Sequence, residues 1–556
     1  MPAITVSTYV FRPVFLTPLD QTPGRLMRVT SSGLIESQTM QASIVGTKAA
    51  AWTIDNQGAI FGRYGIALLG TDDSGTIVNT GGISGAFNGI DLFGSASIVN
   101  SGQIYGYYGA ITSFGRDDAL NLRNLAGGTI TGGTYGDAVL TGSGTILNQG
   151  LIRAGQFGSE ATGIALSDGG TITNGGTILG GSAAVDIGGG IGTLFNSGDV
   201  AAPYGFGVML RGGGLAENSG TIAGYGIGVY VAGGMVSNTG LINGLDNVYD
   251  LRTGTGGGVY LTAAGGTVGN AGTILGLDGI AALGSATIAN TGRIAGSESG
   301  IVLHDGGTVS NGGSIYGTTN GVASVPATSR AAAFTVVNRG SIAGAHGSAI
   351  DGYKFGYGLS VANAGVLSGT YGIRAGERLT LVDTGTIAGS DSGIAASAAS
   401  GIFNSGTITG TGAGPGAYQS SGIYLARGDI TNTGSIAGTG IGVDLAGVGG
   451  AIASTLTYAE QRALEIGVTI AGDARIILLD EPSAGMSAAE AARAVALIRK
   501  VSQGRTLIMI EHDMGVVFDL ADRISVLVYG QIIASDVPAR IKQHRAVQEA
   551  YLGTAA

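Results

Sequence analysis

The chain has 556 residues, of which 107 are glycine, 9 are proline and none is cysteine, and only 12% are charged. The absence of cysteine excludes a disulfide framework and a thiolate metal site. The formal net charge is -10 and the chain has only four lysines. This balance argues against a nucleic-acid partner, because a phosphate backbone needs clustered Lys and Arg.

Composition divides the chain near residue 450. The first 450 residues hold 100 of the glycines and 42 charged residues, whereas the last 106 hold 7 glycines and 22 charged residues. We therefore predict an N-terminal lead-in or cap over 1–51, a repeat domain over 52–448 and a second domain over 449–556.

The repeat domain is built from a short unit. In "SGTIVNTGGISG" and "SASIVNSGQIYG" an Asn has an apolar residue two places before it and another four places after it. This even spacing is typical of short strands that turn alternate residues inward. The Asn position recurs in seventeen units, in one of which it is an aspartate: Asn56, Asn79, Asn100, Asn124, Asn148, Asn174, Asn196, Asn218, Asn238, Asn270, Asn290, Asn311, Asn338, Asn363, Asp383, Asn404 and Asn432.

Such a repeat favours a right-handed parallel β-helix of about 17 coils, in which each coil pairs its backbone with both neighbours. At a spacing of about 4.8 Å, the Asn amides would form a hydrogen-bonded ladder at a buried corner. We therefore give these residues a structural role. The expected fold class is mainly β, a right-handed parallel β-helix followed by a partial α/β domain.

The repeat resembles the passenger region of autotransporter-type outer-membrane proteins over about Trp52 to Gly447. This resemblance implies a structural or adhesive rod at a cell surface. The first thirty residues, however, are interrupted by prolines and lack a basic start followed by a long apolar run, so we expect no secretory signal. No apolar run is long enough to span a bilayer, so direct membrane insertion is not expected.

Two groups of charged residues on the repeat are candidates for carbohydrate chemistry, Asp72 with Asp73 and Arg116 with Asp117 and Asp118. Acid/base cleavage needs carboxylates gathered on one face within a few ångströms. Both groups fit solvated loops at coil corners better, and we assign no catalytic site to the rod.

After Leu456 the pattern changes to helices and strands. Apolar spacing predicts a helix that starts near Ala459, a buried strand over 475–481, an amphipathic helix over 487–503 and a second buried strand over 506–513. This order implies a parallel sheet with right-handed crossovers.

Chemistry in such a sheet gathers at the carboxyl ends of its strands, where Asp480, Glu481 and His512 fall. Two adjacent acids at one strand end and a histidine at the next are therefore the strongest candidates for a site in the chain.

Four motifs of this region resemble, in order, those of the second half of an ATP-binding cassette ATPase. "LTYAEQR" resembles the signature, "IILLDEP" the Walker B strand, "SAGMS" the D-loop and "IMIEHDM" the strand with the switch histidine. The sequences "LLDEPSAGMS" and "IEHDMGVVFDLADRISVLVYGQIIASDVPARI" are similar to those of the subgroup that energises uptake of branched-chain amino acids and related small solutes. The resemblance covers residues 454–553.

The resemblance implies roles for the residues at the strand ends. Asp480 would hold Mg²⁺ through water, because a hard cation that bridges phosphates prefers carboxylate oxygen. Glu481 would act as the general base or orient the attacking water. His512 would contact the γ-phosphate.

In the signature segment the resemblance implies that Thr457, Ala459, Glu460 and Gln461 meet the nucleotide of a partner subunit. The family usually has Ser and Gly at the first two of these positions. Thr457 keeps the hydroxyl, whereas Ala459 adds a methyl group where backbone must approach phosphate, so we expect a weakened contact.

The phosphate-binding loop of this family, GxxxxGK[ST], has no counterpart in the chain. Its amides cradle phosphate and its lysine reaches the β and γ oxygens. The four lysines, Lys48, Lys354, Lys500 and Lys542, follow Thr, Tyr, Arg and Ile, so no Gly-Lys pair exists. The chain is an ATPase by resemblance, with ATP and Mg²⁺ as cofactors, but we predict that it neither binds ATP tightly nor hydrolyses it alone.

Two functions remain open at this point. One is an ATP-binding subunit of a branched-chain amino acid importer, catalytically incomplete, cytoplasmic or peripheral to the inner membrane, with an intact ATPase subunit and a membrane permease as partners. The other is a structural or adhesive rod with an accidental ATPase-fragment tail, at the cell surface if an unrecognised route exports it.

Overall fold

The computed structural model describes most of the chain. The described residues are 3–16, 25–46, 51–69, 75–115, 117–155, 160–244, 256–325, 333–353, 358–412, 421–445, 464, 467 and 475–551. The chain forms two compact units, Met1–Ala446 and Gly447–Ala556. Among the helices in the described ranges, none combines the length and the apolar character needed to cross a bilayer.

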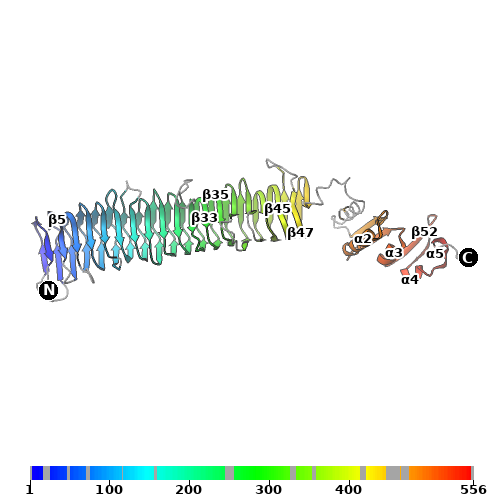
Figure 1. Cartoon of the computed structure of the whole chain (residues 1–556), viewed down its shortest axis with the longest axis horizontal. Coiled ribbons are helices and arrows are strands. Elements are labelled where there is room, and N and C mark those ends of the chain that lie inside the picture. Colours follow the sequence, from blue (N-terminus) through cyan, green and yellow to red (C-terminus); the bar gives the residue numbers. More distant parts are fainter. Residues whose placement is uncertain are drawn as a thin grey trace. The chain divides into compact units, whose positions relative to one another are not determined.

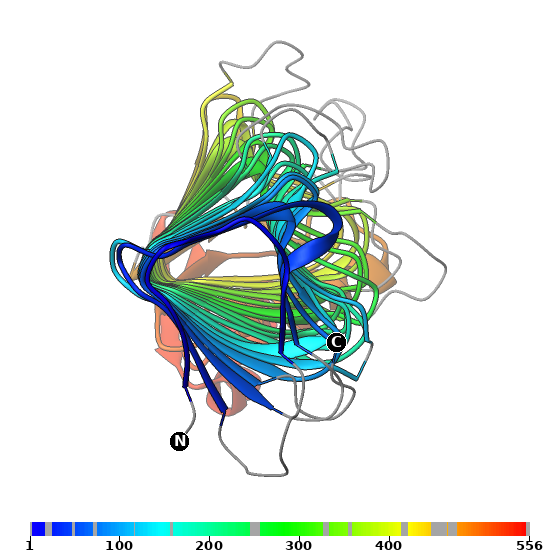
Figure 2. The same ribbon diagram turned by 90° about the vertical axis from the view of Figure 1, so that its left-hand side faces the viewer.

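The first unit is a parallel β-solenoid of about 17 turns. Its strands succeed one another as stacked coils (Figure 1), and the coils superpose when the unit is viewed along its length (Figure 2). Every strand pairing among the described residues of this unit is parallel, as between β8 (Gly75–Asn79) and β11 (Ala96–Asn100), where Asn79 lies beside Asn100. The expected mainly β fold with parallel coils is therefore confirmed.

Each coil has three faces, and the strands of a face pair only with strands of the same face in the coils on either side. The first face holds the strands that end at the Asn position: β1 (Ala3–Val6), β4 (Arg25–Val29), β6 (Trp52–Asn56), β8, β11, β14 (Ala119–Asn124), β17 (Ser143–Asn148), β20 (Gly170–Asn174), β23 (Gly192–Asn196), β26 (Gly214–Asn218), β29 (Gly234–Asn238), β32 (Gly266–Asn270), β34 (Ala286–Asn290), β36 (Gly307–Asn311), β39 (Phe334–Asn338), β42 (Leu359–Asn363) and β44 (Leu379–Asp383).

The second face follows the turn after the Asn position. Its strands are β2 (Tyr9–Val10), β9 (Gly82–Gly85), β12 (Gln103–Gly106), β15 (Thr129–Gly132), β18 (Leu151–Arg153), β21 (Thr177–Leu179), β24 (Asp199–Ala202), β27 (Thr221–Gly224), β30 (Leu241–Gly244), β37 (Ser314–Gly317), β40 (Ser341–Gly344), β46 (Thr407–Gly410) and β48 (Ser435–Gly438).

The third face completes the coil. Its strands are β3 (Val14–Leu16), β10 (Asn88–Leu92), β13 (Gly109–Ser113), β16 (Asp137–Thr141), β19 (Thr162–Leu166), β22 (Ala183–Ile187), β25 (Phe206–Leu210), β28 (Ile227–Val231), β31 (Gly257–Leu261), β38 (Asn320–Ser324), β41 (Ser348–Gly352) and β49 (Ile441–Leu445). Seven longer strands run through more than one face: β5 (Leu34–Gly46), β7 (Ala59–Leu68), β33 (Thr273–Ala282), β35 (Arg293–Leu303), β43 (Val366–Ala375), β45 (Thr386–Asn404) and β47 (Ser421–Asn432).

The core is a continuous stack of inward side chains from all three faces. The apolar residues two places before and four places after the Asn position point into it, as Ile77 and Ile83 do with exposures of 0% and 1%. In the third face Ile90 and Leu92 are equally buried. The spacing read from the repeat thus identifies the inward residues correctly, because strands turn alternate side chains to opposite sides.

The Asn side chains form the ladder that the repeat predicts. The Nδ2 atom of an Asn donates to the Oδ1 atom at the same position of the next coil, at 2.8 Å for Asn218 and Asn238. The same Nδ2 lies 3.1 Å from the carbonyl oxygen of Gly220 and 3.1 Å from that of Leu241. The buried amide group therefore has its donor satisfied and adds a hydrogen bond to two carbonyl oxygens, of which that of Gly220 also accepts from the Leu241 N–H. The series is interrupted at Asp383, which accepts from Asn363 but has no amide to donate to Asn404.

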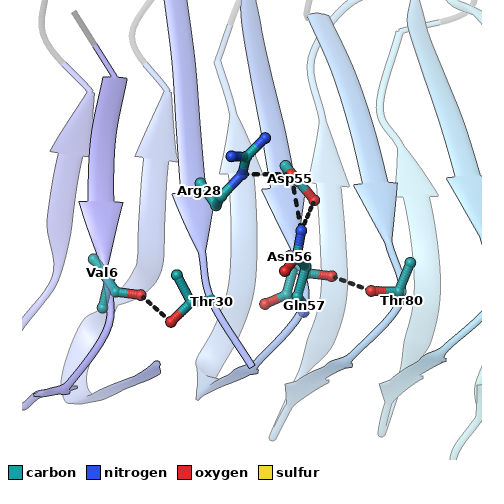
Figure 3. A network of polar contacts seen from close by, with 7 residues as sticks. All are labelled: Val6, Arg28, Thr30, Asp55, Asn56, Gln57 and Thr80. Atoms are coloured by element: carbon teal, nitrogen blue, oxygen red, sulfur yellow. Dashed lines mark hydrogen bonds and ion pairs between the residues drawn. The ribbon is translucent and has the colours of Figure 1, made fainter. Parts of the chain in front are cut away.

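Parallel pairing extends toward the N-terminus beyond the predicted repeat domain. Val6 pairs with Val29, and Val29 pairs with Asn56, so two strands ending in valine precede the first Asn. Figure 3 shows that polar contacts at this end also join successive coils. Arg28 Nε lies 2.7 Å from Asp55 Oδ2, and Thr80 Oγ1 donates to the carbonyl of Asn56.

The second unit contains two small sheets and four labelled helices among its described residues. Strands β50 (Ile476–Asp480) and β51 (Thr506–Ile510) pair in parallel, with Asp480 beside Ile510. The remaining elements are α2 (Ala488–Val501), α3 (Met514–Leu520), β52 (Ile524–Val528), β53 (Gln531–Asp536), α4 (Pro538–Ile541) and α5 (Arg545–Tyr551). Strands β52 and β53 are antiparallel.

Candidate functional site

The carboxyl ends of β50 and β51 bring the predicted catalytic residues together. Strand β50, helix α2 and strand β51 follow the order predicted over 475–513, because apolar residues line both strands and α2 connects them. The helix predicted to start near Ala459 lies outside the described residues apart from 464 and 467. Ile477 on β50 and Ile498 on α2 are both 1% exposed. The backbone pairing of β50 with β51 places Asp480 beside Ile510, and Glu481 and His512 come just after the two strands.

Glu481 and His512 are in direct contact. His512 Nε2 lies 2.9 Å from Glu481 Oε1. Glu481 has a φ of 42°, a left-handed conformation that L residues rarely adopt, and its backbone N–H donates to the carbonyl of Ile510 at 2.8 Å. A residue held in such a conformation at a strand end is a common feature of functional sites.

Glu511 holds the loops on both sides of this pair, a role that the sequence did not reveal. Its Oε1 accepts a hydrogen bond from the backbone N–H of Ser483 at 2.8 Å and another from the Ser483 hydroxyl. Its Oε2 accepts from the backbone N–H of His512 at 2.9 Å. An acid next to the histidine in "IMIEHDM" was the available signal, but only the adjacent strand ends show that it reaches the other loop.

Asp513 and Ser487 fix where the neighbouring helices begin. Asp513 Oδ1 accepts from the backbone N–H of Gly515 at 2.7 Å, which caps the start of α3. The Ser487 N–H donates to Glu490 Oε2 at 2.9 Å at the start of α2. Because capped helix starts are well defined, both loops that lead out of the strand ends have a fixed geometry.

Asp480 offers oxygen chemistry that suits Mg²⁺. The carboxylate is exposed at the end of β50, and no cluster of three or more His, Asp or Glu side chains in the described ranges could form a metal cage by itself. Mg²⁺ is commonly bound through one or two carboxylates together with substrate phosphates and water. The residues present therefore fit a Mg²⁺ ion that arrives with a nucleotide, rather than a resident metal.

The predicted nucleotide contacts of the signature segment, Thr457, Ala459, Glu460 and Gln461, lie outside the described residues.

One face of the β50–β51 sheet is apolar and exposed. Ile476 and Leu478 are 58% and 68% exposed, and Ile508 and Ile510 are 51% and 62% exposed. On the opposite face Ile477 is buried. A parallel sheet normally has both faces covered, so a large part of this sheet's packing surface lacks a partner within the described residues.

Comparison with known proteins finds that part of the chain is similar to ATP-binding subunits of importers. A family model described as the branched-chain amino acid ATP-binding cassette transporter matches residues 531–556. The high-affinity branched-chain amino acid transport ATP-binding protein BraF of Pseudomonas aeruginosa is 40% identical over 105 residues, which are 18% of this chain and 41% of BraF.

Two further relatives show how far the similarity reaches. LivG of Escherichia coli K12, also a high-affinity branched-chain amino acid transport ATP-binding protein, is 38% identical over 105 residues, again 18% of this chain and 41% of LivG. Ribose import ATP-binding protein RbsA 1 of Burkholderia thailandensis is 39% identical over 102 residues, 18% of this chain and 19% of RbsA 1. The chain thus spans well under half of each relative.

Proposed function

We propose that the second unit is part of an ATP-binding cassette site of the branched-chain amino acid uptake type and is joined to a β-solenoid. It would supply the magnesium and water side of that site, which means the residues that hold Mg²⁺ and orient the attacking water. The observation that carries the proposal is the contact between Glu481 and His512 beside Asp480, at the carboxyl ends of two parallel strands. The similarity to BraF and LivG supports the same class of protein.

In this proposal each residue has a defined task. Bound Mg-ATP would supply the phosphate chemistry, with Asp480 holding the metal through water. Glu481 would take the proton of the attacking water or orient it, and His512, which already contacts Glu481 through Nε2, would meet the γ-phosphate. Thr457, Ala459, Glu460 and Gln461 would face the nucleotide of a partner subunit.

The unit is catalytically incomplete in this proposal. The sequence upstream of the signature segment, where the family has its phosphate loop, is occupied by solenoid coils. The exposed apolar face of β50 and β51 is consistent with a domain that lacks packing elements. An intact ATPase subunit bound to a membrane permease is the partner that this class of protein implies, and it would place the unit on the cytoplasmic side of the inner membrane.

The full chain is therefore expected to bind Mg-ATP only weakly. Without amides and a lysine to cradle the phosphates, a calorimetric titration with Mg-ATP should show no saturation below about 1 mM, where the binding free energy is only about 4 kcal/mol. An intact importer subunit measured in parallel serves as the positive control. A dissociation constant in the low micromolar range for this chain would disprove the proposed incompleteness.

A second candidate function, a structural or adhesive rod with an accidental ATPase-fragment tail, is favoured by the solenoid, which holds all the strands described in the first unit. Cell fractionation separates the two. Association with the cytoplasmic membrane together with permeases supports the importer proposal, whereas surface exposure supports the rod.

A further inference from the structure

A groove on the third face of the first coils carries a buried carboxylate between two rows of aromatic side chains. Its volume is about 830 Å³, and it is lined by residues of β3, β5, β7 and β10 and of the turns beside these strands and β13. Ligand sites in proteins have this size, with mostly apolar walls and a few polar groups that fix orientation. The proposed ATPase function makes no use of this groove.

The first aromatic row runs along one side of the groove. The rings of Tyr64 and Phe87 have centroids 5.7 Å apart, and those of Phe87 and Tyr108 lie 5.3 Å apart. Tyr108 is 55% exposed, so its ring remains available to a ligand.

The second aromatic row consists of Phe93 and Phe114. Their rings are stacked with centroids 4.9 Å apart, and the side chains are 41% and 56% exposed. The backbone places them in line, because the Phe114 N–H donates to Leu92 and the Phe93 N–H to Leu68.

Asp91 lies on the floor between the rows. It is only 6% exposed, although it points to the outside of the coil, between the inward residues Ile90 and Leu92. Its register neighbours on the two sides are Ala67 and Thr112. Small side chains beside it thus leave room above the carboxylate.

The carboxylate of Asp91 has one polar partner and no cationic partner within the described residues. Asn88 Nδ2 donates to Oδ1 at 2.7 Å, and no ion pair of Asp91 is formed there. Burial raises the pKa of Asp91 to about 6, against the lowering effect of the Asn88 hydrogen bond. A buried carboxylate of this kind gains stability from any cation brought beside it.

An equivalent aspartate in a later coil has the cationic partner that Asp91 lacks. Asp186 occupies the same outward column four coils further on, through Thr112, Leu140 and Ala165. Arg211 Nε lies 2.8 Å from Asp186 Oδ1, and Arg211 Nη2 lies 2.8 Å from Asp186 Oδ2. The Arg211 N–H donates to Ile187, the residue after Asp186, just as the Phe114 N–H donates to the residue after Asp91.

Phe114 therefore stands where the repeat elsewhere places an arginine. We propose that the groove binds a small organic cation, an ammonium or guanidinium group on an apolar body, with the charge against Asp91 and the body between the two aromatic rows. A cation satisfies both features at once, since the carboxylate supplies a charge-assisted hydrogen bond and the ring faces supply cation–π attraction. A neutral ligand would satisfy only the apolar walls.

The proposal is tested by calorimetric titration of the full chain with phenethylammonium and with its neutral analogue 2-phenylethanol. We expect the ammonium compound to bind at least about tenfold more tightly than the alcohol. Asp91→Asn keeps the shape of the side chain and should remove this preference. Phe114→Arg should abolish binding of the ammonium compound, because the arginine supplies the cation that Arg211 supplies to Asp186.

The matched control is Asp186→Asn, which removes a paired carboxylate from the same column and should leave binding unchanged. Thermal melting by circular dichroism verifies that each variant keeps the fold. Absence of saturable binding by the unaltered chain, equal affinity for the ammonium compound and the alcohol, or unaltered binding by folded Asp91→Asn protein would each overturn the proposal.

Discussion

Replacement of Asn218 by alanine is expected to lower the free energy of unfolding of the solenoid by about 3–5 kcal/mol. The substitution removes the amide that accepts from Asn196 at 2.7 Å and donates to Asn238 at 2.8 Å. It also leaves the carbonyl oxygens of Gly220 and Leu241 without this donor. Each buried polar group that loses its partner costs about 1–3 kcal/mol.

The matched control for this prediction is Asn121→Ala. Asn121 is exposed on the outward side of β14, so its loss should change stability by no more than about 0.5 kcal/mol. Because stacked coils can unfold in parts, amide hydrogen exchange around residues 196–241 should accompany chemical unfolding of the full chain. Equal effects of Asn218→Ala and Asn121→Ala would show that the ladder contributes nothing to stability.

Substitution of Asp383 by asparagine is expected to stabilise the solenoid by about 1–3 kcal/mol at pH 8. Asp383 accepts from Asn363 Nδ2 at 2.7 Å, but an ionised carboxylate cannot donate to Asn404 in the next coil. Its Oδ2 is buried without a partner. An amide at this position would complete the ladder with the donor that every other position supplies.

The gain should grow as pH rises. Burial raises the pKa of Asp383, against the hydrogen bonds from Asn363 and Gly385. A carboxyl group whose pKa is higher in the folded chain contributes stability that is fully present below its unfolded pKa and lost as pH rises through the folded value. The protonated group can also donate, so unaltered protein and Asp383→Asn protein should differ little at pH 4.

Denaturant midpoints at pH 4 and pH 8 measure this difference. Asp429→Asn is the matched control, because Asp429 is exposed on β47 and the same change there should have little effect at either pH. A gain from Asp383→Asn that is larger at pH 4, or that equals the effect of Asp429→Asn, would contradict the assigned role of the ladder.

Much of the solenoid could be predicted from the sequence because its determinants are local and repeated. The two inward positions of a coil, such as Ile77 and Ile83, could be predicted because side chains alternate between the two sides of a strand. The Asn column could be predicted because the same residue recurs at one place in nearly every coil. The start of the solenoid was less evident. Val6 and Val29 take the Asn position in the first strands, so the motif is absent where the pairing is present.

The groove was not visible in the sequence for a different reason. The aromatic residues that line the groove with Asp91 belong to several coils, and the number of residues between equivalent positions varies with turn length. Phe114 and Arg211 occupy equivalent places only once the register is known. In the second unit, the closeness of Glu481 and His512 could be predicted because each follows a recognisable strand. The contacts of Glu511 could not, because they join the turns after two strands.

The most direct test of the proposed cassette site is a chimera that joins the N-terminal part of an intact importer ATPase, phosphate loop included, to residues 454–556 of this chain. If Asp480, Glu481 and His512 form the magnesium and water side of the site, the chimera should hydrolyse ATP, and Glu481→Gln should reduce turnover by about 100-fold or more. A folded chimera that binds Mg-ATP yet turns over no faster than its Glu481→Gln variant would contradict the proposed function.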